Sequence, residues 1–147
     1  MSTDQTTQDA SLAEINATTQ RVIGCAIEVH RQLGPGLLEQ TYESAMCIEL
    51  QACGVPYERQ PAIMIEYKGK RIGEHRADLV VAGAVVVELK SVERFDPVFA
   101  AQILTYLRCT GPRVGLLINF SGRVLRTGIR RFILSCETAL CPLCLCG

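Results

Sequence analysis

The spacing of apolar residues changes near Gly54, and this change constrains the fold more than any other feature of the sequence. Before Gly54, apolar residues recur every three or four positions, which is typical of helices with one buried face. The segment Gly34-Pro35-Gly36 interrupts the pattern, because glycine suits the left-handed position after a helix and proline cannot continue it. We therefore expect two helices, over residues 11–33 and 37–53.

After Gly54, apolar and polar residues alternate, which is typical of strands with one buried face. The predicted strands cover residues 55–58, 62–67, 71–81, 85–90, 114–119 and 124–134. A third helix is expected to begin after Asp96, a favoured N-cap, with Pro97 as its first residue, and to end near Cys109. The order helix, helix, strands, helix, strands predicts one mixed α/β or α+β domain.

The length and composition suit one soluble globular domain. The 147 residues allow a single core, which we expect over residues 11–134, between a disordered tail at residues 1–10 and a cysteine-rich tail at residues 135–147. The net charge is zero and 48% of the residues are apolar, which excludes a disordered chain, a collagen-like fibre and a highly basic DNA-coating protein. The sequence shows neither a secretory signal nor a membrane span, so we expect a cytoplasmic protein with reduced cysteines.

Two charged residues interrupt the most apolar predicted strand. Glu88 and Lys90 lie two positions apart in residues 85–90, so both side chains leave the same face. Burying an acid and a base there costs free energy unless they are paired, bound to metal or placed at a rim. A metal site is one interpretation, and a partly exposed ion pair at a strand edge is the alternative.

The position of Asp78 relative to Glu88 depends on the turn between their strands. A three-residue loop of residues 82–84, with Gly83 left-handed, places Asp78 opposite Glu88. A two-residue loop places it opposite Leu89, on the other face. We expect the three-residue loop, because it forms a site of two carboxylates. Such oxygen ligands suit Mg²⁺ or Mn²⁺, with water and a substrate phosphate at the remaining positions.

These residues also carry a family resemblance. Asp78 and the later Glu88-Leu89-Lys90 resemble the D…(D/E)-x-K signature of the PD-(D/E)xK nuclease superfamily, with Ala77 in place of its proline. The segment Gly36-Leu37-Leu38-Glu39-Gln40-Thr41-Tyr42 resembles the motif that names the GxxExxY protein family, a branch of that superfamily. The resemblance covers about residues 15–134 and implies a restriction-endonuclease-like core, with a mixed central β-sheet flanked by helices.

The resemblance implies a role for each matching residue of the signature. Asp78 and Glu88 would bind the divalent metal, helped by the backbone carbonyl of Leu89. Glu39 would be a third acid that reaches the metal directly or through water. Lys90 would orient the attacking water and stabilise the charge that develops on the phosphate.

Two further residues extend the resemblance to the third predicted helix. Gln102 and Tyr106 are similar to the Q-x-x-x-Y element of some of these nucleases, and they would brace the site or contact the nucleic-acid backbone. Together these roles imply a Mg²⁺- or Mn²⁺-dependent hydrolase of phosphodiester bonds, with DNA favoured over RNA, acting as a monomer or a homodimer and without a membrane. The alternative is a catalytically weak or inactive nucleic-acid-binding accessory protein on the same scaffold.

Positive charge is concentrated in two parts of the chain. Between Pro97 and Cys136 there are six arginines and no acidic residue. A smaller set surrounds a predicted hairpin: Lys68, Lys70, Arg71 and Arg76. Both sets suit a phosphate-binding surface without sequence specificity, although solvated arginines on alternating strand positions explain the first set equally well. His75 is a candidate for substrate contact, and His30 is expected to flank the end of the first helix.

Four cysteines crowd the end of the chain: Cys136, Cys141, Cys144 and Cys146. Four thiols could bind zinc or an iron–sulfur cluster, which makes a thiol–metal protein a third hypothesis. Their spacing is poor for a zinc ribbon, however, so we favour a tail that binds neither.

Overall fold

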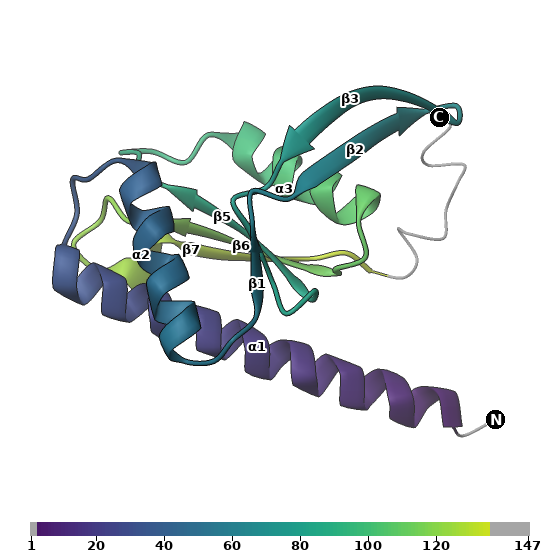
Figure 1. Ribbon diagram of the computed structural model, residues 1–147, viewed down its shortest axis with the longest axis horizontal. Coiled ribbons are helices and arrows are strands. Elements are labelled where there is room, and N and C mark those ends of the chain that lie inside the picture. The colour runs from purple at the N-terminus through teal and green to yellow at the C-terminus, as the bar shows by residue number, and fades with distance from the viewer. Residues whose placement is uncertain (1–2, 136–147) are drawn as a thin grey trace.

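The computed structural model describes residues 3–135, with side chains from residue 12 onward (Figure 1). Its helices are α1 (Thr3–Leu33), α2 (Glu39–Ala52), α3 (Pro97–Cys109) and the short 3₁₀ helix η1 (Leu125–Gly128). Its strands are β1 (Tyr57–Arg59), β2 (Ala62–Tyr67), β3 (Lys70–Arg76), β4 (Leu79–Val81), β5 (Val85–Lys90), β6 (Val114–Asn119) and β7 (Ile129–Ile133). The predicted mixed α and β architecture is confirmed.

The strands form two separate sheets. The larger has the order β1-β4-β5-β6-β7, and β2 pairs only with β3. The β5–β6 pair is parallel and its neighbours are antiparallel, so the sheet is mixed, as predicted. A parallel pair needs a long crossover, which α3 provides between β5 and β6.

Helices cover both faces of the larger sheet (Figure 1). Val85, Val87 and Leu89 alternate along β5 and pack with α1 and α2 into one apolar cluster. Val86, between them in sequence, packs with α3 into a second cluster. This alternation explains why nearly every residue of β5 is buried. Glu88 and Lys90 follow the spacing of Val86, so they face the α3 side.

Several elements have the bounds predicted from local sequence. These are β2, β5, β6 and α3. The Asp96 side chain accepts a hydrogen bond of 2.9 Å from the Val98 N–H and caps α3, and Pro97 is the first helical residue. Helix α1 ends at Leu33, before a left-handed Gly34. Strong local signals, namely caps, glycines and prolines, therefore determined these boundaries.

Two predicted strands have different bounds in the structure. The strand expected at residues 71–81 is divided into β3 and β4 at Ala77 and Asp78, because β3 pairs with β2 whereas β4 joins the larger sheet. The strand expected at residues 124–134 begins with η1, and β7 is shorter. At Gly128, a side chain would lie 2.4 Å from the Asn119 carbonyl oxygen, so the chain there packs too closely for other residues.

The N-terminal helix is longer than expected. Its backbone is helical from Thr3, whereas the sequence predicted a tail through residue 10. Once a helix is nucleated, each added residue gains a hydrogen bond without needing tertiary contacts, so a polar segment can continue it. None of the helices in the described part of the chain combines the length and hydropathy of a membrane span. The four C-terminal cysteines lie outside the described residues.

Candidate active site

The turn between β4 and β5 brings two acidic residues together. Val81 pairs with Val85, which leaves a three-residue loop with Gly83 in a left-handed conformation. Leu79 pairs with Val87, so Asp78 and Glu88 are next in register. The predicted three-residue loop is confirmed, and the two-residue alternative is wrong.

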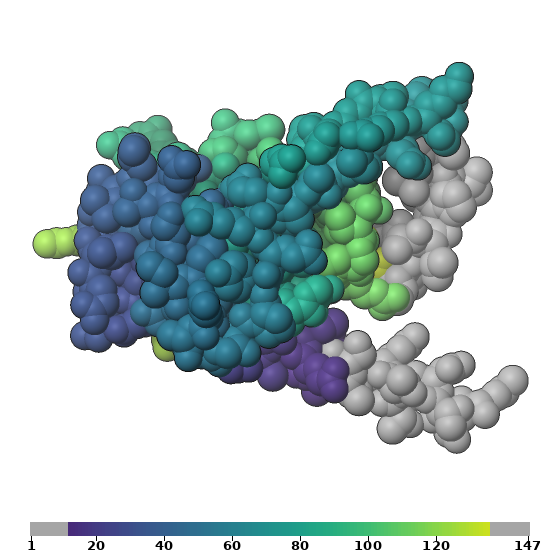
Figure 2. Space-filling view, viewed as in Figure 1, coloured from purple at the N-terminus to yellow at the C-terminus, as the bar shows by residue number. Residues whose placement is uncertain are grey.

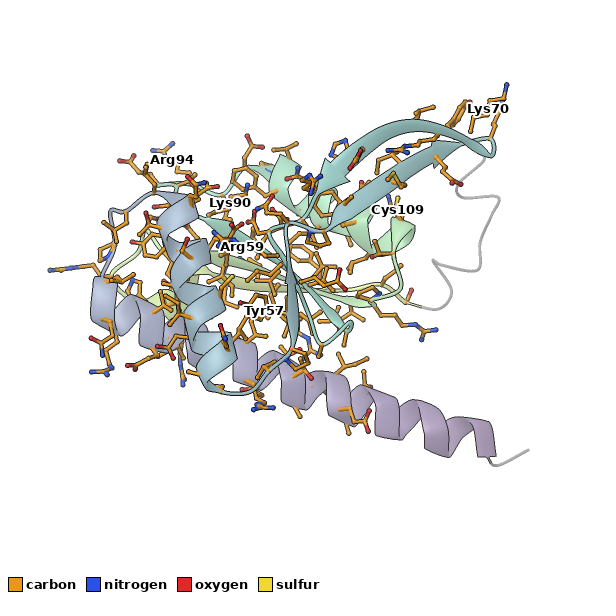
Figure 3. The ribbon with its side chains drawn as sticks, viewed as in Figure 1. Tyr57, Arg59, Lys70, Lys90, Arg94 and Cys109 are labelled. Atoms are coloured by element: carbon orange, nitrogen blue, oxygen red, sulfur yellow. The ribbon has the colours of Figure 1, made fainter. Side chains whose placement is uncertain are left out.

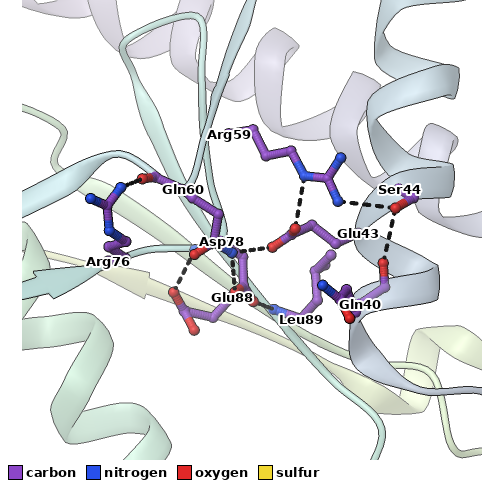
Figure 4. Close-up of polar contacts among 9 residues, drawn as sticks. All are labelled: Gln40, Glu43, Ser44, Arg59, Gln60, Arg76, Asp78, Glu88 and Leu89. Atoms are coloured by element: carbon purple, nitrogen blue, oxygen red, sulfur yellow. Dashed lines mark hydrogen bonds and ion pairs between the residues drawn. The ribbon is translucent and has the colours of Figure 1, made fainter.

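Two hydrogen bonds join the strands at this point (Figure 4). The backbone N–H of Asp78 donates to Glu88 Oε1 at 3.0 Å, and the backbone N–H of Leu89 donates to Asp78 Oδ2 at 2.7 Å. Each carboxylate therefore accepts from the backbone of the other strand. These bonds hold the two carboxylates in place beyond the last backbone pair of the ladder.

Burial dominates the electrostatics of the pair. It raises the pKa of Glu88, and the neighbouring charge of Asp78 raises it further. Burial likewise raises the pKa of Asp78, against the hydrogen bond from Leu89. Glu88 is buried, and β5 is the middle strand of the larger sheet, so the interpretation as an exposed pair at a strand edge is wrong. A divalent cation would offset the repulsion between these carboxylates.

Lys90 is the last residue of β5 (Figure 3). Its positive charge lowers the pKa of both Asp78 and Glu88, although burial outweighs this effect. The ammonium Nζ lies 4.6 Å from the centre of the Phe99 ring, a cation–π contact with α3. Among residues 12–135, no carboxylate forms an ion pair with Lys90, so the ammonium is held by an aromatic face.

Helix α2 supplies acids to the same region. Glu39 is its first residue, and it lines an open pocket of about 520 Å³ together with Gln40, Glu43, Arg59, Gln60 and Asp78. The charge of Glu39 makes a small contribution to the raised pKa values of Asp78 and Glu88. Residues 12–135 contain no cluster of three or more acidic, histidine or cysteine side chains that could hold a metal. Glu39 therefore lies near the pair without joining it.

Three of the pocket residues that the sequence did not predict form a polar bridge (Figure 4). The Arg59 Nε donates to Glu43 Oε2 at 2.8 Å. The Gln60 side-chain amide donates to Glu43 and lies 3.4 Å from Asp78 Oδ1, so it bridges Glu43 of α2 and Asp78, the residue before β4. Glu43 could have been found, because it lies four residues after Glu39 on one helix face. Gln60 and Arg59 carry no such signal, because their position follows from the pairing of β1 with β4.

Helix α3 brings the predicted Gln102 and Tyr106 to the site. Burial raises the pKa of Tyr106 to about 12, and the charge of Glu88 adds to this shift, whereas a hydrogen bond with Gln102 opposes it. The His75 ring stands edge-on to Tyr106, with ring centres 6.1 Å apart. A Cβ at Gly115 of β6 would lie 2.5 Å from Ile103, so this glycine lets α3 pack directly against the sheet.

Tyr42 is a structural residue that shapes the start of α2. Its ring is buried and stacks on Phe120, with ring centres 4.3 Å apart. Its hydroxyl donates to the Gly34 carbonyl at 2.5 Å and accepts from the Leu37 N–H at 3.2 Å. The turn that precedes Glu39 is thereby fixed. His30 is also a structural residue: its Nε2 lies 2.8 Å from the Gly122 carbonyl oxygen, a contact that joins α1 to the loop after β6.

The donor set fits a hard divalent cation. Asp78 and Glu88 offer carboxylate oxygens side by side, and Glu39 lines the same pocket as Asp78. Mg²⁺ in proteins is commonly bound by one or two carboxylates while it keeps several waters. A third direct protein ligand is therefore not required for such a site.

The comparisons with known proteins agree with this geometry. The family model described as the PD-(D/E)XK nuclease superfamily matches residues 16–132, which is most of the chain. Its members generally use divalent metal ions. In the two other comparisons, no curated protein and no solved structure matches the sequence. The fold, the paired carboxylates and this match lead to one conclusion: the chain belongs to the PD-(D/E)XK nuclease superfamily.

Proposed function

We propose that the protein is a divalent-metal-dependent nuclease that hydrolyses phosphodiester bonds in DNA. The observation that carries the proposal is the Asp78–Glu88 pair, a half-buried and a buried carboxylate held side by side by backbone hydrogen bonds where β4 begins beside β5. Membership of the superfamily supports the nuclease activity.

Asp78 and Glu88 would hold Mg²⁺ or Mn²⁺, with the Leu89 carbonyl as a further ligand and Glu39 acting through water. When bound, such an ion supplies Lewis acidity, which activates water and neutralises the phosphate charge. The Leu89 N–H keeps Asp78 oriented, and Gln60 holds the other oxygen of Asp78 toward Glu43. The chain therefore provides a rigid set of oxygen donors before substrate binds.

Lys90 would orient the attacking water and stabilise charge on the phosphate. Its ammonium is near both carboxylates, as its effect on their pKa values indicates, and it is not paired with either. Tyr106, held by Gln102, borders Glu88 from the α3 side and would brace the site.

We also propose that the chain belongs to the GxxExxY branch of the superfamily. Three features of residues 36–42 support this. Gly36 has a φ of +99°, which favours glycine. Glu39 begins α2 beside the pocket. The Tyr42 hydroxyl binds the turn before Glu39. Each named position of the motif thus has a physical task in presenting the acid.

The test combines cleavage and metal binding. Purified protein is incubated with single- and double-stranded DNA and RNA in Mg²⁺ or Mn²⁺, beside Asp78→Asn and Lys90→Ala. We expect both variants to lose at least about a hundredfold in rate, as is usual when a charge-stabilising group is removed. Calorimetry should show that Asp78→Asn loses metal affinity, whereas Lys90→Ala retains it. Glu58→Gln, an exposed acid of β1 outside the pocket, is the matched control. Cleavage that survives both site variants would refute the assignment.

One observation favours a second candidate function, a nucleic-acid-binding accessory protein with little turnover. The Lys90 ammonium rests on the Phe99 ring, 4.6 Å from its centre, rather than on either carboxylate. This candidate predicts salt-dependent binding of nucleic acid without metal-dependent cleavage. The same assays therefore distinguish the two functions.

A further inference from the structure

The β2–β3 hairpin forms a separate two-stranded ribbon, residues 62–76, which we call the arm. Its strands pair from Ala62 with Arg76 at the base to Tyr67 with Lys70 at the tip. The arm projects beyond the body of the molecule (Figure 2), and Lys70 lies at its far end (Figure 3). Six strand residues at about 3.3 Å each give the ribbon a length of about 20 Å.

Only the base of the arm is packed against the domain. Ile63 is buried in the cluster around α3, and Ile65 packs against the same cluster. Toward the tip, the side chains of Tyr67 and Ile72 are 58% and 64% exposed. A two-stranded hairpin with exposed apolar residues gains little stability alone. The arm therefore contributes little to the stability of the fold, and binding to a partner explains its exposed apolar residues better.

The charge of the arm indicates the chemistry of that partner. The arm has four basic residues and two acidic ones. Glu74 forms ion pairs with Arg71, at 2.9 Å, and with Arg76, at 3.7 Å. In the described part of the chain, no carboxylate pairs with Lys68 or Lys70, which flank the tip. Lys68 Nζ lies 5.4 Å from the centre of the Tyr67 ring, which leaves its charge unneutralised. The tip therefore presents two ammonium groups without a carboxylate partner to a polyanion.

The arm is connected directly to the candidate active site. Strand β2 begins two residues after Gln60, and β3 ends two residues before Asp78. At this junction the Arg76 Nη1 donates to the Gln60 carbonyl at 2.8 Å (Figure 4). A polyanion held along the arm would therefore pass beside the two carboxylates.

We propose that the arm binds in the major groove of B-form duplex DNA and positions a phosphodiester strand at the Asp78–Glu88 site, an inference that rests on the proposed function and specifies its substrate. The major groove of B-DNA is about 12 Å wide and admits a two-stranded β-ribbon. The major groove of duplex RNA is too narrow for side chains to enter. Lys68 and Lys70 contact phosphates, so the arm reads shape and charge rather than sequence.

The test measures binding by fluorescence anisotropy without divalent ions, with duplex DNA, duplex RNA and single-stranded DNA of equal length. We expect duplex DNA to bind at least about tenfold tighter than duplex RNA. Lys68→Ala/Lys70→Ala should weaken duplex DNA binding by at least about tenfold in low salt, and should reduce the slope of log affinity against log salt by about 1.8. The charge-preserving Lys68→Arg/Lys70→Arg should recover the slope.

A folding control and a partner control accompany this measurement. Both lysines are exposed, so the alanine variant should keep the melting temperature of the wild type. If the arm instead joins two copies of the chain, Ile72→Lys would convert a dimer into a monomer in analytical ultracentrifugation, and the alanine variant would bind DNA normally. That result, or equal affinity for duplex RNA, would overturn the proposal.

The experiments distinguish a refuted DNA-binding role of the arm from a refuted nuclease activity. Binding that depends on Lys68 and Lys70, without metal-dependent cleavage, would support the arm and refute the proposed activity. Cleavage lost in Asp78→Asn, with binding and cleavage unchanged in the lysine variant, would support the activity and refute the arm.

Discussion

Strands β2 and β5 each have six residues, but they place charged side chains in opposite environments. On β5 every residue except Lys90 is buried, and burial shifts the pKa of Glu88 strongly. On the β2–β3 arm most residues are exposed, and charges such as those of Lys68 and Lys70 remain in solvent. The comparison shows that burial rather than residue type decides the electrostatics of a charged side chain: a buried carboxylate has a shifted pKa, whereas exposed lysines keep their charges in solvent.

The largest expected difference concerns apolar packing. Leu116→Ala, in the strand beside β5, removes a fully buried side chain and should cost about 2–5 kcal/mol of unfolding free energy. Ile72→Ala, in the arm, should cost less than about 0.5 kcal/mol, because that side chain is mostly exposed. Urea denaturation measures both. Equal losses would mean that the arm is packed in solution.

The second effect is the pH dependence of the unfolding free energy of the metal-free protein. Burial raises the pKa of Asp78 and Glu88 in the folded state above that in the unfolded state, so the folded state binds more protons. The unfolding free energy should therefore fall as pH rises above about 4, by at least about 2 kcal/mol in total, since one pKa unit corresponds to about 1.4 kcal/mol. Below the ordinary carboxyl pKa this penalty is absent.

Urea unfolding at a series of pH values, with chelator present, measures the slope of the unfolding free energy against pH. Asp78→Asn should flatten it and stabilise the metal-free protein at high pH, because one of the two repelling carboxylates is gone. Added Mg²⁺ should bind more tightly at high pH and release protons, which calorimetry in buffers of different ionisation enthalpy detects. An unchanged slope in Asp78→Asn would contradict the assigned electrostatics.

A smaller difference is expected between two glycines. Gly115→Ala places a methyl group against Ile103 and should cost about 1–3 kcal/mol, with α3 displaced from the sheet. Gly73→Ala, in the arm, meets no atom within 4 Å and should change stability by less than about 1 kcal/mol, with either sign. Thermal unfolding and a crystal structure of Gly115→Ala would test this. A neutral Gly115→Ala would show that α3 is free to shift.

The smallest difference is between two ion pairs of similar length. Arg59 pairs with Glu43 at 2.8 Å, where the carboxylate is 8% exposed, and Arg71 pairs with Glu74 at 2.9 Å, where it is 39% exposed. Arg59→Met should cost about 1–2 kcal/mol, because it leaves a buried acid with fewer partners. Arg71→Met should cost less than about 0.5 kcal/mol. If Arg59→Met lowers the melting temperature more than Arg71→Met does, burial rather than distance sets how much each ion pair stabilises the fold. Equal melting temperatures would contradict this.

Local sequence predicted the central elements better than their neighbours. The bounds of β5, β6 and α3 follow from apolar runs limited by glycine, proline and an Asp96 cap, which act within a few residues. The division at Ala77 and Asp78 was not predictable in this way. It arises because β3 and β4 pair in different sheets, and strand partners depend on residues far away in sequence.

The candidate site shows the same limit. The Asp78–Glu88 pairing was predictable, because one short loop sets the register of a hairpin. The bridge from Gln60 to Glu43 was not, because it needs α2, β1 and β4 to meet, and Gln60 adopts a left-handed conformation, with φ of +54°, that its residue type does not predict. Glu39 was identified from its motif, but its separation from the Asp78–Glu88 pair was not predictable, because it depends on how α2 packs beside the sheet.

The sequence by itself determined which residues could form strands, where α3 begins and which acids are paired, because caps, turns and alternation act over short distances. Only the tertiary structure decided that Glu88 is buried in a central strand, that Lys90 rests on Phe99 and that the arm stands away from the domain. Burial and sheet order are sums over contacts from distant segments, and those contacts set the pKa of a carboxylate and the exposure of a lysine.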